Sequence, residues 1–103
     1  MADLTQEEWA ERLDKDTNAV VLDVRTIEEV EDGYIPEAIH IDIYLGQEFL
    51  AELEKLDKDK NYYVYCRTGN RSGQACSLMI DRGFQNAFNL MGGIAEWEGE
   101  IVD

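Results

Sequence analysis

Residues 62–72 read YYVYCRTGNRS, and this stretch decides how the rest of the chain is interpreted. The apolar run 62–65 has the length and the aromatic content of a buried strand. After the loop, Ala75, Leu78 and Met79 recur at helical spacing, and Gly83 follows where that helix should end. The stretch therefore predicts a strand, a tight loop that opens with Cys66, and a helix.

The loop has the composition of a site for a reactive thiol and an anion. Thiolate is the nucleophilic form of cysteine, and nearby cations and a helix N-terminus both favour it. Gly69 lets successive backbone N–H groups point at one centre, while Arg67 and Arg71 add charge and forked donors. Ser72 is expected to cap the following helix. We therefore expect a cysteine nucleophile that meets an anionic ligand.

Strand-like and helical segments alternate over the rest of the chain. Short apolar runs at 19–24, 38–41 and 87–90 indicate further strands. Capping boxes that pair Thr5 with Glu8 and Thr26 with Glu29 predict two helix starts, and Gly33 is placed to end the second helix. Further helices are expected over 49–56 and after residues 92–93. This alternation predicts an α/β fold with a parallel sheet and helices on both faces. Ligands of such sheets bind beyond the carboxyl ends of the strands, where Cys66 is expected.

Length and charge narrow the possible functions. The 103 residues are expected to form one domain, 1–103, and the net charge of −14 disfavours nucleic acid and anionic membranes as partners. No apolar run approaches the roughly 20 residues of a membrane helix. The acidic N-terminus lacks the features of a signal peptide, so we expect a cytoplasmic protein. No Asp or Glu occurs from Lys60 to Ile80, which leaves the cysteine loop in a basic segment.

The chain has two cysteines and one histidine, which is too little for a disulfide scaffold or a zinc pattern. No metal is therefore expected. Cys76 shares an apolar helical pattern with Met79 and Ile80, so we expect a buried, inert thiol. The alternative is a resolving cysteine for Cys66.

His40 is interpreted as a packed or solvated side chain. For Asp23 and Arg25 we expect structural roles, with Arg25 paired to Glu28 or Glu29.

Several ordered motifs over nearly the whole chain resemble the single-domain rhodaneses, a family of sulfurtransferases. The motifs are LDVRT at 22–26, GYIPEAI at 33–39, the cysteine loop, and NLMGGI at 89–94 with Trp97. Two departures stand out, because Tyr34 and Glu37 replace the histidine and the second glycine of the family's usual Gly-His-Ile-Pro-Gly-Ala. The resemblance implies a rhodanese-like fold with a five-stranded parallel sheet.

The resemblance also implies an activity. Cys66 would take a sulfane sulfur from thiosulfate or a similar anionic donor as a persulfide, and a thiol, cyanide or a protein thiol would accept it. No metal or organic cofactor is needed. The anion-binding loop would comprise Arg67, Thr68, Gly69, Asn70, Arg71 and Ser72. One alternative is a persulfide carrier that partner proteins load. Related cysteine phosphatases place arginine six positions after cysteine, whereas this chain has Arg71 five positions after Cys66, so phosphatase activity is the weaker alternative.

Overall fold

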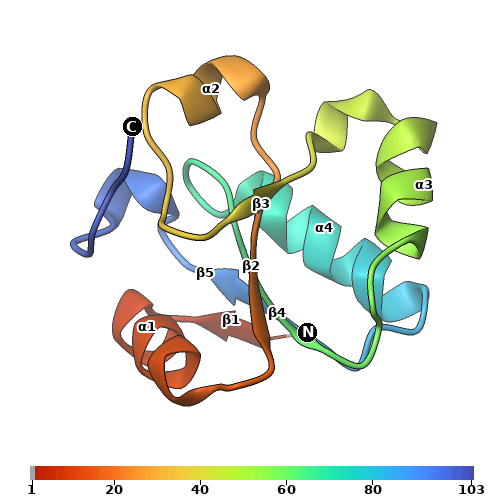
Figure 1. Ribbon diagram of the computed structural model, residues 1–103, viewed down its shortest axis with the longest axis horizontal. Helices are drawn as coiled ribbons and strands as arrows, with labels where there is room; N and C mark the ends of the chain where they lie inside the picture. The colour runs from red at the N-terminus through yellow and green to blue at the C-terminus, as the bar shows by residue number, and fades with distance from the viewer. Residues whose placement is uncertain (1) are drawn as a thin grey trace.

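Five parallel strands form one sheet in the order β1-β5-β4-β2-β3 in the computed structural model, which describes residues 2–103 (Figure 1). The central strand is β4, and the short strands β1 and β3 lie at the edges. The strand bounds are Ala2–Leu4 (β1), Ala19–Asp23 (β2), Ile39–His40 (β3), Asn61–Tyr65 (β4) and Asn86–Leu90 (β5). The expected five-stranded parallel sheet is confirmed.

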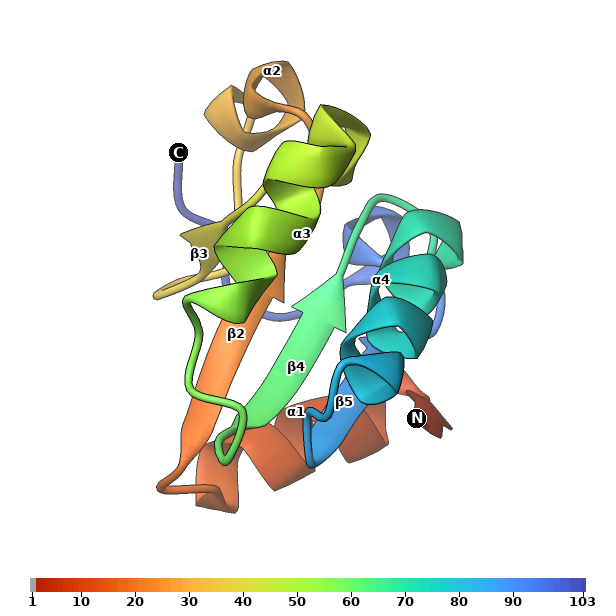
Figure 2. The same cartoon turned by 90° about the vertical axis from the view of Figure 1, so that its right-hand side faces the viewer.

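Helices cover both faces of the sheet, as expected. Helices α3 (Gln47–Glu54) and α4 (Asn70–Asp81) pack on one face, and α1 (Gln6–Lys15) packs on the other. The short helix α2 (Ile27–Glu31) lies beyond the carboxyl ends of the strands (Figure 2). Two 3-10 turns, η1 (Ile43–Leu45) and η2 (Ile94–Glu96), complete the elements. No helix within residues 2–103 is long and apolar enough to cross a bilayer.

The pleat of β4 divides its side chains between two cores. Tyr62, Val64 and Cys66 face α3 and α4, whereas Tyr63 and Tyr65 face α1. On the α1 face, Trp9 is fully buried and meets the ring of Tyr63 edge-on, with ring centroids 5.8 Å apart. Complete burial of one large apolar side chain contributes about 1.5–3 kcal/mol. The same alternation fixes the face on which Cys66 lies.

Most elements match the sequence-based predictions. Both predicted capping boxes are present, and Gly33 follows α2 with a φ of +134°. The apolar runs indicated four strands, and the fifth is the edge strand β1 at residues 2–4, which finds its backbone partners along β5. The predicted helix after residues 92–93 was wrong. It is only the turn η2, since the chain then returns to form an antiparallel bridge between Tyr34 and Val102.

Glu37 is the one described non-glycine residue with a positive φ, at +68°. A left-handed backbone strains residues that carry a Cβ, by about 1–2 kcal/mol. We expect Glu37→Gly to raise the free energy of unfolding by about 0.5–1 kcal/mol in urea denaturation, after the entropic cost of glycine in the unfolded chain is subtracted. Glu37→Ala removes the same carboxylate and keeps the strain, so it should give no such gain. Equal stability of the two variants would contradict this explanation.

Candidate active site

The cysteine loop lies at the carboxyl end of β4, where the sulfur of Cys66 accepts hydrogen bonds from the start of α4. The N–H groups of Gly69 and Ser72 lie 3.1 and 3.4 Å from Cys66 Sγ. Gly69, with a φ of +106°, is the residue that precedes the helix. The prediction that Ser72 caps α4 was therefore wrong, because the helix starts at Asn70. The sulfur takes the N–H of the third helical residue, which a capping side chain usually accepts.

These contacts favour the thiolate of Cys66. Burial by itself acts to raise the pKa of this thiol. Hydrogen bonds from the Ser72 hydroxyl and from the N–H groups of Ser72, Gly69 and Thr68 outweigh the effect of burial, and the pKa lies below its ordinary value. The side chain exposes only 1% of its surface, so the loop shields the sulfur from large reagents.

The hydroxyl of Ser72 has two acceptors within reach but only one proton. It lies 3.3 Å from Cys66 Sγ and also contacts Oδ1 of Asn89. The amide of Asn89 in turn donates to the Asp3 carboxylate and to the carbonyl of Gly69, at 2.9 and 3.1 Å. Asn89 therefore links β1, β5 and the cysteine loop. The sequence motif contained Asn89 but did not identify this role, because the contacts come from residues far apart in the chain.

The turn after β5 closes against the cysteine loop. The N–H groups of Ile94 and Ala95 donate to the carbonyls of Cys66 and Arg67, each at 3.0 Å. A Cβ at Gly93 would collide with the backbone of Arg67 and Thr68. Glycine at this position is thus needed for close approach of the two loops.

Arg71 is held by an acidic residue from another element. Its guanidinium forms a bidentate pair with the Glu29 carboxylate of α2, at 2.6 and 2.8 Å, and lies over the ring of Tyr44. The Arg71 pair is the main cause that lowers the pKa of Glu29 from about 4.5 to about 2. The segment 60–80 contains no Asp or Glu, but the fold brings Glu29 of α2 against the cysteine loop. Arg71 is therefore not a free cation.

Helix α2 is fixed to the sheet by a buried ion pair at the end of β2. Arg25 donates to the Asp23 carboxylate at 2.7 Å, and the Tyr65 hydroxyl donates to the same carboxylate. The guanidinium also donates to the carbonyls of Glu29 and Gly33. The predicted partners of Arg25, the side chains of Glu28 and Glu29, were wrong, because Asp23 is closer and the carboxylate of Glu29 binds Arg71. Structural roles for Asp23 and Arg25 fit these contacts.

The remaining loop residues face solvent. Arg67, Thr68 and Asn70 are exposed, and Arg67 forms no ion pair within residues 2–103. The half-buried His40 contacts the backbone carbonyl of Arg25 through Nε2, at 2.6 Å, which is a packing role. Arg67 is thus the cation in this loop that is available to a ligand.

Cys76 is fully buried among the apolar residues of α4, as predicted. Burial raises the pKa of its thiol to about 12, which makes it inert at neutral pH. In the described part of the chain, no group of three His, Cys, Asp or Glu side chains is placed to hold a metal ion.

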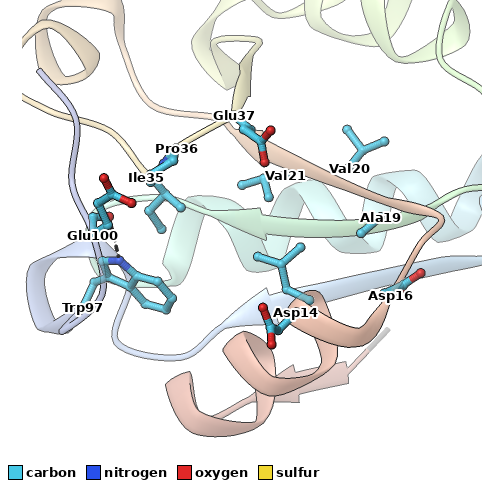
Figure 3. A pocket seen from close by; sticks show the side chains of 11 residues that line it. Asp14, Asp16, Ala19, Val20, Val21, Ile35, Pro36, Glu37, Trp97 and Glu100 are labelled. Carbon is cyan, nitrogen blue, oxygen red and sulfur yellow. Dashed lines mark hydrogen bonds between the residues drawn. The ribbon is translucent and has the colours of Figure 1, made fainter.

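A hollow of about 680 Å³ lies on the opposite face of the sheet, between α1, β2 and the C-terminal segment (Figure 3). Its charged lining residues are all acidic: Asp14, Asp16, Glu37 and Glu100. It is lined by no cysteine, and Cys66 belongs to the other core. The candidate active site is therefore the cysteine loop.

Comparison with known proteins places the chain in a family. Residues 5–100 match the family described as "Rhodanese-like domain". The chain therefore belongs to the rhodanese-like domain family. It is 41% identical to the "Putative sulfurtransferase YtwF" of Bacillus subtilis over 87% of this chain and 84% of that protein. It is 30% identical to the "Thiosulfate sulfurtransferase GlpE" of Pseudomonas savastanoi pv. phaseolicola, over 86% and 81%. A rhodanese-like domain protein of Staphylococcus aureus has a similar crystal structure, with a TM-score of 0.82, 31% identity, and coverage of 97% and 94%.

Removal of the Ser72 hydroxyl should make Cys66 less acidic. We expect the rate of alkylation by iodoacetamide to rise with pH, with a midpoint below the roughly 8.5 of a free cysteine. Ser72→Ala should move this midpoint upward, because the thiolate loses a hydrogen-bond donor. Gln74→Ala changes an exposed residue of the same helix and should leave the midpoint in place. An unchanged midpoint in Ser72→Ala would contradict this prediction. It would show that the Ser72 hydroxyl donates its hydrogen bond to Asn89 Oδ1 and not to the sulfur of Cys66.

The Glu29–Arg71 pair should stabilise the fold in a pH-dependent way. The pKa of Glu29 is lower in the folded chain than in the unfolded one, so the stabilisation is complete above about pH 4.5 and disappears as the pH falls toward 2. Glu29→Gln keeps the capping oxygen but loses the charge. We expect it to lower the free energy of unfolding by about 1–2 kcal/mol at pH 7, with allowance for solvent screening.

Urea denaturation of wild type and Glu29→Gln between pH 7 and pH 3 measures this difference, which should narrow below about pH 4.5. Glu28→Gln removes an exposed carboxylate of the same helix and is the matched control. A difference that stays constant down to pH 3 would contradict the role of the ion pair.

Proposed function

We propose that the protein is a thiosulfate sulfurtransferase that carries sulfur as a persulfide on Cys66. The observation that supports this most strongly is the sulfur atom that accepts two backbone N–H groups and a hydroxyl at the end of a strand. The family assignment and the name of the Pseudomonas relative agree with the same chemistry.

In the first step, the Cys66 thiolate attacks the outer, sulfane sulfur of thiosulfate. A new S–S bond forms, the S–S bond of thiosulfate breaks, and sulfite leaves with the bonding electron pair. The product is a persulfide anion on Cys66. The N–H groups that stabilise the thiolate surround the loop centre and are suited to stabilise this anion as well.

In the second step, an acceptor thiolate or cyanide attacks the terminal sulfur. The bond between the two sulfurs of the persulfide breaks, and the electron pair returns to Cys66 as thiolate. Neither step needs a metal or an organic cofactor, and the charge moves between sulfur atoms.

The anionic end of the donor is assigned to Arg67 and to the exposed backbone at Thr68 and Asn70. Arg67 has no competing ion pair within the described residues, whereas Arg71 is bound by Glu29. Arg71 therefore contributes to the electrostatic potential around Cys66 and orders the loop, and Arg67 meets the donor. This division refines the expectation that both arginines bind the donor.

A persulfide carrier, loaded by partner proteins with little free turnover of thiosulfate, is the second candidate. The observation that favours it is the burial of Cys66 in a strongly acidic chain, which slows encounters with a dianionic donor. Steady-state turnover of thiosulfate with cyanide distinguishes the two functions, because a carrier forms the persulfide but turns over slowly.

The test is the mass of the protein after incubation with thiosulfate. Wild type should gain about 32 Da, the mass of one sulfur atom, and Cys66→Ala should neither gain this mass nor produce thiocyanate from cyanide. Cys76→Ala changes the buried, inert thiol and should retain both. Turnover that persists in Cys66→Ala would exclude the proposed mechanism.

A further inference from the structure

Four exposed apolar side chains lie on elements that contact the cysteine loop. Ile27 on α2, Tyr44 and Leu45 on η1, and Met91 after β5 expose between 47% and 69% of their surface. Three contacts connect their elements to the loop. Arg71 binds α2 through Glu29 and lies against Tyr44, and Gly69 adjoins the backbone on either side of Met91. We call these four residues the apolar rim.

Exposed carboxylates accompany the apolar rim. Glu28, Glu31 and Asp32 lie on or just after α2, and Glu48 lies in the first turn of α3. None of the four forms an ion pair within the described chain. Asp32 also lines a hollow of about 390 Å³ beside the loop, together with Arg67 and Ile94. The carboxyl end of the sheet thus presents apolar groups and unpaired negative charge.

Most positive charge lies at the opposite end of the molecule. Of the nine cations, Arg25 and Arg71 are committed to carboxylates at the site, and Arg67 is the third cation at this end. The other six lie on α1 or at the amino end of the sheet: Arg12, Lys15, Lys55, Lys58, Lys60 and Arg82. This segregation means that a partner approaching Cys66 meets an acidic field with one arginine at its centre.

We propose that the sulfur acceptor is a protein whose cysteine thiol lies in an apolar segment flanked by lysine and arginine. The inference rests on the proposed function, since it concerns the second step at the same cysteine. Lysine and arginine of the acceptor would pair with the unpaired carboxylates at the site. Apolar residues beside the acceptor's thiol would pack against the apolar rim. A small anionic donor needs neither contact. The unpaired carboxylates beside the apolar rim thus assign the two steps to partners of opposite charge: an anionic donor and a basic acceptor.

The charge argument gives the two steps opposite responses to one set of substitutions. Neutralisation of the carboxylates beside the apolar rim weakens their attraction for a basic acceptor. It also reduces their repulsion of thiosulfate. In the variant Glu28→Gln/Glu31→Gln/Glu48→Gln, discharge to a basic thiol should therefore slow, while loading by thiosulfate should stay the same or become faster. General damage to the site would slow both steps.

The experiment uses two labelled peptides that share a Leu-Cys-Leu centre and carry either lysine and arginine or glutamate on both sides. Serine replaces cysteine for measurements of binding by fluorescence anisotropy, which need no persulfide. Wild type should bind the basic peptide more tightly than the acidic one. The triple variant Glu28→Gln/Glu31→Gln/Glu48→Gln should lose about fivefold in affinity for the basic peptide at low salt. Replacement of both leucines of the basic peptide by serine should weaken its binding to wild type, because the apolar rim then loses its contacts. With cysteine present, mass spectrometry follows discharge of the loaded protein.

The control is Asp14→Asn/Asp59→Asn/Asp81→Asn, which removes the same amount of charge from exposed residues away from the site. It should lose less than about twofold in affinity. Equal losses in both variants, or equal binding of the two peptides, would overturn the inference. Failure of thiosulfate to load wild type would instead reject the proposed function, and the binding preference would still test the docking surface.

Discussion

The N–H groups of Gly69, just before α4, and of Ser72, in its first turn, point at the sulfur of Cys66, and the structure of the site depends on these contacts. A helix N-terminus has unpaired donors that need acceptors, and a thiolate needs donors to remain charged under a protein surface. The short loop satisfies both needs at once, because Gly69 turns the chain sharply enough for Gly69 and Ser72 to reach the same atom. The start of the helix and the acidity of the cysteine are therefore one structural feature.

That loop is held from outside by a series of charged groups that begins in the core. The buried Asp23–Arg25 pair ties the end of β2 to the backbone of α2, and α2 then presents Glu29 to Arg71. A buried pair of this kind adds little net stability, but loss of one partner costs about 3–5 kcal/mol, so the geometry is strongly enforced. Helix α2, only five residues long, depends on these contacts for its position.

The charge close to Cys66 differs from the charge on the surface around it. The local field at Cys66 comes from backbone N–H groups, the Ser72 hydroxyl and Arg71, whereas the wider surface around it carries unpaired carboxylates. Dipoles act within a few ångströms and net charge acts over a Debye length of about 8 Å. The anionic donor that we propose would therefore be stabilised once it reached the loop, although the net charge of the molecule repels it.

The sequence by itself determined the strand, loop and helix around Cys66, the alternation of elements, and both capping boxes. These features depend on contacts between residues a few positions apart, which a local pattern records. Only the tertiary structure decided that β1 pairs with β5, that the Glu29 carboxylate binds Arg71 whereas Arg25 binds Asp23, and that the Ser72 hydroxyl reaches Asn89 as well as Cys66. The β1–β5 pairing, the Glu29–Arg71 pair and the Ser72–Asn89 contact join residues between 17 and 86 positions apart. Parallel strands are joined through crossovers that bring such residues together, and no local pattern encodes which distant side chain arrives.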